Sequence, residues 1–473
     1  MRAVLGAAWL LAAAAAAAAA QSRGVLPQDY YRMTFVSDVQ VSPTGAHLAF
    51  TVQTVVEEKN ARHQEIWLQR LERGRPAGAP FRFTAPTYES SDPRWSPDGT
   101  VLAFSSRRGE DRNTAWFARV TEPGGEAYHV EGVNGAPVWS PDGRWIAYTR
   151  APDDEADSAG QGGRGAEGRR KGWIAPDAVS RTLDAQRFDG RVITSMRYKR
   201  DGTLTLLPHY SVRPKSQLYV VAASGGEPRR LTALPFDVGG VFWSADSRTL
   251  YFGGNPEQDN EYNVENTQQI YAVALDGGEP RALTANPGSE NNAALSPDGK
   301  SLAYVLTADR GAQPEVMVVA LAPDGGFAGA PRNLTAEWDL IPGAPAWTPD
   351  GRALRWTAGI GGDQHLFEVP ARGGPVRQVT AGARQLREVT WSGDGRVMGY
   401  TATDAATPAE VFVSAWDGRN EAPVTSFNHE WLAETVRMPA ERLTWRVADG
   451  TEIEGWVVKP VGFQPGRKYP MVL

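Results

Sequence analysis

The chain carries six histidines but lacks the spacing that would make any of them part of a catalytic group. They are His47, His63, His129, His209, His365 and His429. None belongs to a recognisable serine or cysteine nucleophile pattern. Gly-x-Ser-x-Gly, which places a serine on a strained strand-to-helix turn, occurs nowhere in the 473 residues. The nearest approach is Gly-Lys-Ser-Leu-Ala at residues 299–303, which we expect to pack inside a repeated strand. The sequence therefore assigns no catalytic residue.

Metal and cofactor chemistry finds no support in the residue pattern either. The sequence has no His-Glu-x-x-His, no glycine-rich phosphate loop and no Cys/His metal spacing. Because cysteine is absent, disulfides, thiolate nucleophiles, cysteine-ligated zinc and iron–sulfur clusters are excluded together. The net charge of -6, from 49 basic and 55 acidic residues, gives no electrostatic reason to expect nucleic acid or an anionic membrane as a partner. We expect no cofactor and no metal.

What the sequence repeats instead is a turn. Seven segments consist of an apolar residue followed by Ser-Pro-Asp-Gly or a close variant. They are residues 41–45, 95–99, 139–143, 243–247, 295–299, 347–351 and 391–395, with a degenerate further copy at 199–202. Their spacing of roughly 44–60 residues is typical of propellers or solenoids.

Each of these turns is suited to reversing a strand. Proline presets φ for a type I turn, aspartate is tolerated next, and glycine takes the positive-φ position. Apolar strands follow the turns, as at residues 101–104 and 301–304, and a second hairpin then ends in Leu-Thr, as at residues 231–232. Four strands cannot cover both of their faces alone, so we expect the sheets to stack in a closed, all-β propeller. The motif tryptophans would then pack blade on blade, and the motif aspartates would form turns rather than bind metal.

The number of blades is open between seven and eight. Eight turn motifs stand against seven Leu-Thr-like endings, near Thr84, Val130, Thr232, Thr284, Thr335, Thr380 and Thr425. The shortfall lies between Ser140 and Thr232, where a glycine-rich, charged insertion at residues 151–172 interrupts the pattern. Its composition is typical of a disordered surface loop; a flap over a substrate opening is the alternative. We expect seven blades with an enlarged third.

The two ends of the chain do not follow the repeat. Residues 1–20 combine a positive start, an alanine-rich apolar run and small residues before Gln21, the pattern of a secretory signal peptide; a membrane anchor is the alternative. We expect an exported, most simply periplasmic, protein with no membrane attachment after cleavage. A lead-in would occupy residues 21–38 and the propeller residues 39–428. Residues 443–458 predict a hairpin with an Asp-Gly turn, and the final strand start indicates a further domain that is cut short.

A family resemblance follows from these blades together with the segment at residues 449–460, Asp-Gly-Thr-Glu-Ile-Glu-Gly-Trp-Val-Val-Lys-Pro. They resemble the prolyl oligopeptidase family of serine peptidases, and within it the acylaminoacyl-peptidase and dipeptidyl-peptidase 5 branch. Residues 196–202 and 254–267 add to the resemblance. It implies a propeller joined to an α/β-hydrolase domain, of which residues 429–473 would be the linker and the first hairpin. Family members continue into an oxyanion segment, the nucleophile elbow, an aspartate and a histidine, none of which is recognisable here.

The resemblance implies that the propeller gates the active site and grips short peptides, in some relatives through carboxylates that bind the substrate's α-ammonium. Glu57 and Glu58 have suitable charge, as do the acidic residues within 257–261. Lys59 and Arg62 beside the first pair make a solvated charged hairpin tip the better interpretation, and a solvated loop is likewise the better interpretation of the second. Neither segment is assigned as a site.

The sequence therefore predicts an exported serine peptidase of this family, acting on short peptides as a dipeptidyl or acylaminoacyl peptidase. This chain would be a fragment of it, inactive alone. The alternative is a non-enzymatic Tol-type periplasmic propeller that binds protein partners. The start of another domain after the ring favours the peptidase. Cleavage preference and oligomeric state are left open by the sequence.

Overall fold

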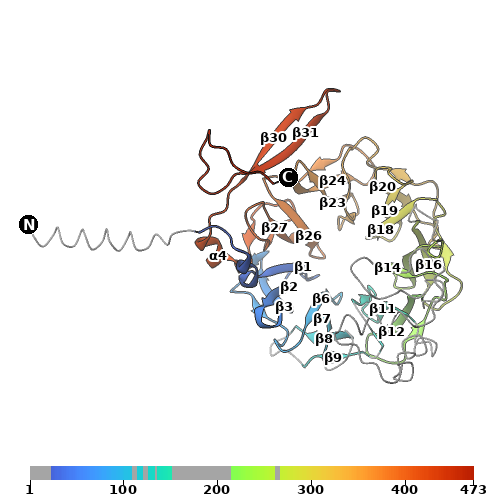
Figure 1. Cartoon of the computed structure of the whole chain (residues 1–473). Helices are drawn as coiled ribbons and strands as arrows, with labels where there is room; N and C mark the ends of the chain where they lie inside the picture. Colours follow the sequence, from blue (N-terminus) through green and yellow to red (C-terminus); the bar gives the residue numbers. More distant parts are fainter. Residues whose placement is uncertain are drawn as a thin grey trace, which may run out of the picture.

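The computed structural model describes residues 23–108, 114–120, 126–130, 132–133, 136–151, 215–260 and 267–472. Their strands form antiparallel sheets, and all of these sheets except the two-stranded one near the end of the chain are arranged as a ring (Figure 1). Five sheets form one blade each, and an eight-stranded sheet forms two more, joined by a parallel bridge between Gln364 and Gln385. The described residues thus form seven blades, and the expected all-β propeller is confirmed. The expected signal peptide, most of the insertion and the degenerate turn at residues 199–202 lie outside the described residues.

The blades follow one another along the chain, each numbered from its innermost strand outward. Blade 1 contains β1 (Phe35–Val41), β2 (His47–Val56), β3 (Ala61–Glu72), β4 (Arg75–Pro76) and β5 (Phe81–Arg82). Blade 2 contains β6 (Ser90–Trp95), β7 (Val101–Ser106), β8 (Thr114–Arg119) and β9 (Tyr128–His129). Blade 3 contains β10 (Val138–Trp139), β11 (Trp145–Arg150), β12 (Gln217–Ala222) and β13 (Arg229–Arg230). The long insertion therefore separates the second and third strands of this blade.

The other four blades have four strands each. Blade 4 contains β14 (Val238–Trp243), β15 (Thr249–Gly254), β16 (Gln269–Ala274) and β17 (Arg281–Ala282). Blade 5 contains β18 (Ser289–Leu295), β19 (Ser301–Thr307), β20 (Glu315–Ala320) and β21 (Arg332–Asn333). Blade 6 contains β22 (Ala346–Trp347), β23 (Ala353–Ile360), β24 (Asp363–Pro370) and β25 (Arg377–Gln378). Blade 7 contains β26 (Gln385–Trp391), β27 (Val397–Thr403), β28 (Glu410–Ala415) and β29 (Ala422–Pro423).

The repeated turn is held by its own side chains. In blade 5 the Ser296 hydroxyl donates to Asp298 Oδ1 at 2.6 Å and accepts from the backbone N–H of Ser301 at 2.9 Å. Asp298 also accepts from the Lys300 N–H, and Gly299 has φ of 70°. These contacts occupy Oδ1 of the aspartate and lower the pKa of the carboxyl group, the hydrogen bond from Ser296 first of all. The motif aspartates are therefore turn formers, as predicted.

The motif tryptophans fasten neighbouring blades. The indole N–H groups of Trp95, Trp243 and Trp347 donate, at 3.0, 3.0 and 2.9 Å, to the carbonyl oxygens of Gln40, Val138 and Ala294. Each acceptor belongs to the innermost strand of the preceding blade, so the predicted blade-to-blade packing is confirmed. Trp139 and Trp391 hold equivalent positions, but among the described residues their buried indole nitrogens have no acceptor.

The threonine of the Leu-Thr ending explains why that residue recurs. Its hydroxyl accepts a hydrogen bond from a backbone N–H in the third strand of the same blade. The pairs are Thr84 with Ile66, Thr232 with Leu218, Thr284 with Ile270, Thr335 with Val316, Thr380 with Leu366 and Thr425 with Val411. The outermost short strand is thereby tied to its blade by a buried hydroxyl. Blade 2 has Val130 at this position instead, and there the N–H of Ala115 donates to the Val133 carbonyl at 3.1 Å.

The ring closes between blades 7 and 1 without exchange of strands. Every strand of blade 1 comes from the start of the repeat and every strand of blade 7 from its end. Apolar side chains of both blades share one core, which includes Val36, Leu48 and Val411. Polar contacts cross the same seam, among them a hydrogen bond from the Gly393 N–H to the Pro43 carbonyl at 2.8 Å. Closure therefore depends on side-chain packing and cross-seam hydrogen bonds.

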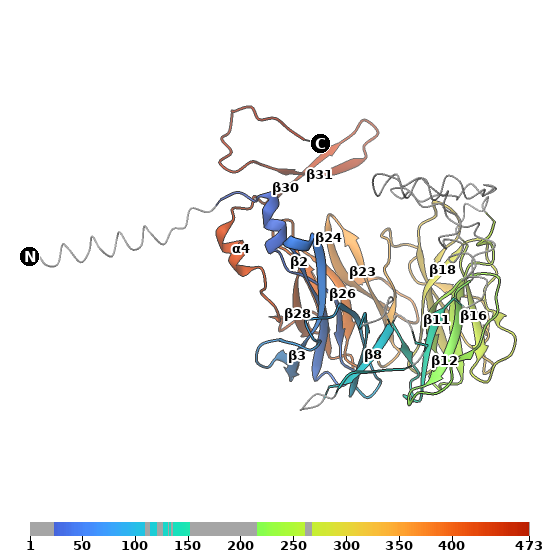
Figure 2. The same cartoon turned by 60° about the horizontal axis from the view of Figure 1, so that its bottom comes forward.

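Beyond the ring, a short helix leads to the expected hairpin. The helix α4 (His429–Glu434) is followed by β30 (Ala440–Arg446) and β31 (Glu452–Val458), which pair in full register across the Asp449-Gly450 turn. Figure 2 shows the hairpin above the end of the ring where the 3₁₀ helix η1 (Pro27–Arg32) also lies. Within the described part of the chain, no helix has the length and apolar character needed to cross a membrane.

Candidate substrate-binding face

The order of strands gives the ring two different faces. In blade 1 the chain enters through η1, descends β1 to the turn at residues 41–45, and returns along β2. The connection between β2 and β3 is therefore on the side of η1, and the repeated turns are on the opposite side. Because the other blades repeat this order, their second-to-third-strand connections share the face of η1 and the hairpin (Figure 2). We call it the loop face, and the opposite one the turn face.

Both acidic segments considered from the sequence lie on the loop face. Glu57 and Glu58 form the 3₁₀ turn η2 (Glu57–Lys59), whose last hydrogen bond is closed by Asn60 in the left-handed conformation at φ 45°. Both glutamates are exposed, and among the described residues neither carboxylate has an ion-pair partner. The structure places them as a solvated hairpin tip with free negative charge.

The second acidic segment is tied down by its neighbours. Asp259 forms an ion pair with Lys215, and Gln258 hydrogen-bonds to Asp237. Glu257 accepts from the Asn260 amide at 3.1 Å, while residue 261 lies outside the described residues. Asp259 therefore ties this loop to Lys215 beside blade 3, and Glu257 is engaged within the loop itself. Both carboxylates are poorer partners for a substrate than those of Glu57 and Glu58.

Five of the innermost strands carry a feature that the sequence analysis missed. Each has a β-bulge in which one residue adopts positive φ. These residues are Asp38, Asp92, Gly240, Asn292 and Glu388, with φ between 50° and 60°. Each stands three positions before the apolar residue that opens the repeated turn. Most of these positions hold Asp, Asn or Gly, which tolerate the left-handed region. The fixed offset was therefore a signal that the sequence already contained.

Three of the bulge residues, on consecutive blades of the ring, are acidic: Asp38, Asp92 and Glu388. Asp38 is neutralised by Arg94 of blade 2, at 2.9 Å. Glu388 is exposed to solvent, but the surrounding blades desolvate its carboxylate and raise its pKa. The negative charge of Asp38 adds to this rise, and the backbone amides of Asp38 and Val39 oppose it.

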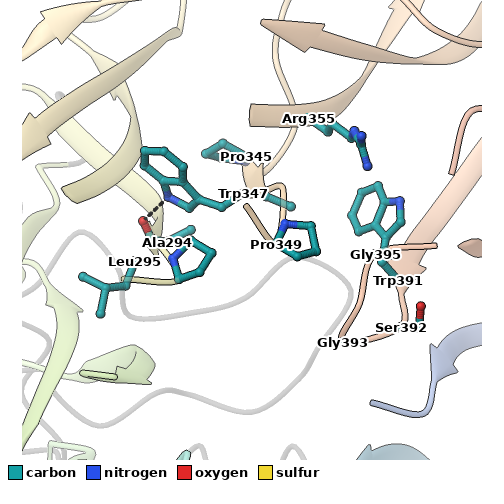
Figure 3. Close-up of a pocket in the computed structure, with 12 residues that line it drawn as sticks. Ala294, Leu295, Pro345, Trp347, Pro349, Arg355, Trp391, Ser392, Gly393 and Gly395 are labelled. Atoms are coloured by element: carbon teal, nitrogen blue, oxygen red, sulfur yellow. Dashed lines mark hydrogen bonds between the residues drawn. The ribbon is translucent and has the colours of Figure 1, made fainter. Parts of the chain in front are cut away.

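Two cavities distinguish the faces further. A cavity of about 610 Å³ with a mixed polar and apolar wall lies between the innermost strands of blades 4 and 5, and Asp237, Glu290 and Asn292 are among its lining residues. Figure 3 shows a mainly apolar cavity of about 480 Å³ that lies among the repeated turns of blades 5 to 7. Trp347 and Trp391 line it, and in Figure 3 the indole nitrogen of Trp391 points away from Trp347. This apolar cavity is on the turn face, away from the free glutamates.

The described histidines are used structurally. His63 lies between two carboxylates, 2.7 Å from Glu89 and 3.0 Å from Glu65. His365 is buried against the Thr380 hydroxyl, and His429 bonds to a backbone carbonyl. Among the described residues no imidazole ring hydrogen-bonds to a serine hydroxyl; His47 reaches Ser42 Oγ only through its backbone N–H, at 3.0 Å. No group of three or more His, Asp or Glu side chains in the same ranges could hold a metal ion.

Comparison with known proteins adds family information to this geometry. Residues 156–314 match the family described as the dipeptidyl peptidase IV N-terminal region. The chain is 22% identical to dipeptidyl-peptidase 5 of Porphyromonas gingivalis, over 94% of this chain and 62% of that protein. It is 25% identical to an uncharacterized peptidase of Bacillus subtilis, YuxL, over 95% of this chain and 65% of that one. The chain thus spans less than two thirds of the length of these relatives.

Solved structures agree on the fold. Acylaminoacyl peptidase of Pyrococcus horikoshii superposes with a TM-score of 0.65 at 16% identity, over 93% of this chain and 60% of that one. The β-propeller domain of the Trilobed protease from Pyrococcus furiosus, described as having an open velcro topology, gives 0.54 at 14% identity, over 84% and 99% of the two chains. The resemblance to the prolyl oligopeptidase family expected from the sequence is confirmed.

Proposed function

We propose that this chain is the substrate-gating and substrate-binding part of an exported serine peptidase of the prolyl oligopeptidase family, which acts on short peptides. The observation that carries the proposal is the likeness to dipeptidyl-peptidase 5 over 94% of the chain. It is supported by a propeller whose loop face bears a strand hairpin beyond the ring. The catalytic serine, aspartate and histidine would come from the domain that follows the hairpin in the relatives.

The loop face gives the propeller two ways to act on a peptide. The seven packed blades would keep folded proteins away from anything that sits over this face, and a short extended peptide could still enter. Glu57 and Glu58 would offer unpaired negative charge to the α-ammonium of such a peptide. An acylated amino terminus has no positive charge, so these glutamates would distinguish dipeptidyl from acylaminoacyl substrates.

The test uses the whole gene product that contains this chain. We expect it to react with a fluorophosphonate probe for active serines and to hydrolyse dipeptidyl-aminomethylcoumarin substrates. Replacing Glu57 and Glu58 together by glutamine should raise KM for dipeptidyl substrates by about tenfold, the effect of losing roughly 1.4 kcal/mol of charge attraction, and leave N-acetylated substrates unchanged. A matched variant, Glu257→Gln on blade 4, should change neither.

Two results would overturn the proposal at different levels. A gene product that neither reacts with the probe nor hydrolyses any peptide substrate is not a serine peptidase. If the substitutions at Glu57 and Glu58 leave KM unchanged for both substrate types, the peptidase does not use these residues to bind the ammonium. Export is tested separately by N-terminal sequencing of the protein from a periplasmic fraction, where we expect the mature chain to begin close to Gln21.

A further inference from the structure

The beginning of the described chain is joined to the segment that leads into the hairpin. Arg23 pairs with Thr435 in a parallel β-bridge. Its N–H donates to the Glu434 carbonyl at 3.0 Å, and its carbonyl accepts from the Val436 N–H at 2.7 Å. Residues more than 400 positions apart thus share main-chain hydrogen bonds. We call residues 23–34 together with 428–436 the clasp.

A buried carboxylate organises the first half of the clasp. Asp29 is 2% exposed and binds both terminal nitrogens of Arg23, at 2.8 and 2.5 Å. It also accepts from the Leu26 N–H at 2.8 Å. The hydrogen bond from Arg23 is the main reason why the pKa of Asp29 lies far below its usual range. Charge-assisted, two-pronged contacts of this kind fix geometry as well as add energy.

The second half of the clasp reaches the seam of the ring. Arg32 binds the Glu434 carboxylate through both of its terminal nitrogens, at 2.7 and 3.0 Å. Asn428 clamps the main chain of Thr34, accepting from its N–H at 3.0 Å and donating to its carbonyl at 2.8 Å. The next residue, Phe35, begins β1 of blade 1. The clasp therefore ends where blades 7 and 1 meet.

The same short segments touch both the seam and the root of the hairpin. Val436 is held by Arg23, and β30 begins at Ala440. Blade 7 exchanges no strand with blade 1, so the clasp adds main-chain hydrogen bonds to a seam that otherwise depends on side-chain packing and isolated contacts such as that of Gly393 with Pro43. We propose that the clasp is a mechanical coupling element, which closes the seam and fixes the direction in which the hairpin leaves the ring. A substitution at Asp29 that loosens the clasp therefore makes both the seam and the root of the hairpin more mobile.

The first test is hydrogen exchange in the full chain carrying Asp29→Asn. The amide side chain keeps the size of the carboxylate but loses its charge and one acceptor. We expect exchange to become about tenfold faster or more at residues 436–446 and at the seam strands β1 and β26, with blades 3 to 5 unchanged. Asp298→Asn is the matched control, because it removes a carboxylate with lowered pKa from a turn of blade 5. It should affect that turn alone.

The second test restores the coupling by a covalent lock. The chain contains no cysteine, so Arg23→Cys with Thr435→Cys introduces a single pair. Bridged strands lie ~4.8 Å apart, inside the range that a disulfide spans. Reduced, the double variant should exchange like Asp29→Asn; oxidised, it should return to the wild-type pattern at both the seam and the hairpin root. Three results would overturn the coupling: exchange that changes only within residues 23–34, oxidation that leaves the seam unaffected, or cysteines that fail to pair.

Discussion

Asn428 is the residue at which the closure of the ring can be measured most directly. Its side chain is 2% exposed and holds the Thr34 main chain by two hydrogen bonds. Its N–H and its Nδ2 lie 3.1 and 3.3 Å from Glu410 Oε1. Asn428→Ala deletes the side-chain contacts and leaves a buried N–H, a buried carbonyl and a carboxylate with fewer partners. A neutral hydrogen bond contributes about 1 kcal/mol, and more where its loss leaves a buried group unpaired. We therefore expect the free energy of unfolding to fall by roughly 2–4 kcal/mol.

The assay is denaturant unfolding followed by tryptophan fluorescence, together with hydrogen exchange at Thr34. Asn333→Ala is the matched control, because Asn333 also joins a glutamate side chain to a backbone N–H, but within blade 5. It should destabilise blade 5 without faster exchange at Thr34. Asn428→Asp is the sharper variant, since it replaces the donor beside Glu410 by a second carboxylate. At neutral pH Asn428→Asp should lower the free energy of unfolding more than Asn428→Ala does. At acidic pH the difference between the two variants should become smaller, because the new carboxylate is protonated.

Two outcomes would refute this reasoning. If Asn428→Ala lowers the free energy of unfolding by less than about 0.5 kcal/mol, the value typical of an uninvolved surface change, the hydrogen bonds of Asn428 do not hold the seam. If Asn428→Asp equals Asn428→Ala at every pH, Glu410 does not feel the side chain at position 428, and the hydrogen-bond arrangement at the seam is different from the one described.

Three further predictions concern side chains within the blades. Trp347→Phe should cost about 1 kcal/mol through loss of its cross-blade hydrogen bond, whereas Trp391→Phe, which has no such bond to lose, should be near neutral in the same unfolding assay. Thr232→Val should lower the free energy of unfolding by about 2 kcal/mol, and Thr232→Ser by much less, because serine keeps the hydroxyl. Equal losses would mean that the methyl group contributes as much as the hydroxyl. Burial alone would lower the pKa of His63, but hydrogen bonds with Glu89 and Glu65 outweigh it and raise the pKa. The stabilisation by His63 should therefore be complete below its unfolded pKa of ~6.5 and fade as pH rises through the folded value; His63→Gln should destabilise at pH 5.5 and not at pH 9.

The parts of the fold that the sequence revealed are those with local causes. A turn such as residues 295–299 contains all of its own determinants, because the serine, aspartate and glycine that form it are neighbours in the chain. The alternating strands beside it follow from the same short pattern. The hairpin at β30 and β31 was predicted for the same reason, since Asp449 and Gly450 form its turn. None of these required knowledge of distant residues.

The parts that could not be predicted depend on partners hundreds of residues away. Nothing local marks Asp29 as the buried acceptor of Arg23, or Asn428 as the clamp on Thr34. Likewise, Trp347 and Trp391 stand in the same motif, and only the packing of their blades decides which indole finds a carbonyl. The bulge residues are an intermediate case. Their offset from the turn was visible, but their meaning follows only when the innermost strands are known to bend there.

The division between the two faces of the ring explains why the repeated motif does not indicate where a ligand binds. The residues that recur lie on the turn face and inside the blades. There the turn serine and aspartate bond to each other, and the motif tryptophan and the threonine bond to backbone groups. The loop face is built from connections that differ in every blade, so a binding site there leaves no periodic trace. The carboxylates of Glu57 and Glu58 differ from those of Asp298 and Asp259 because, among the described residues, they have no hydrogen bond or ion pair. Charge that stabilises nothing within the fold remains available to a ligand, and this makes the tip of blade 1 the first place to look for substrate recognition.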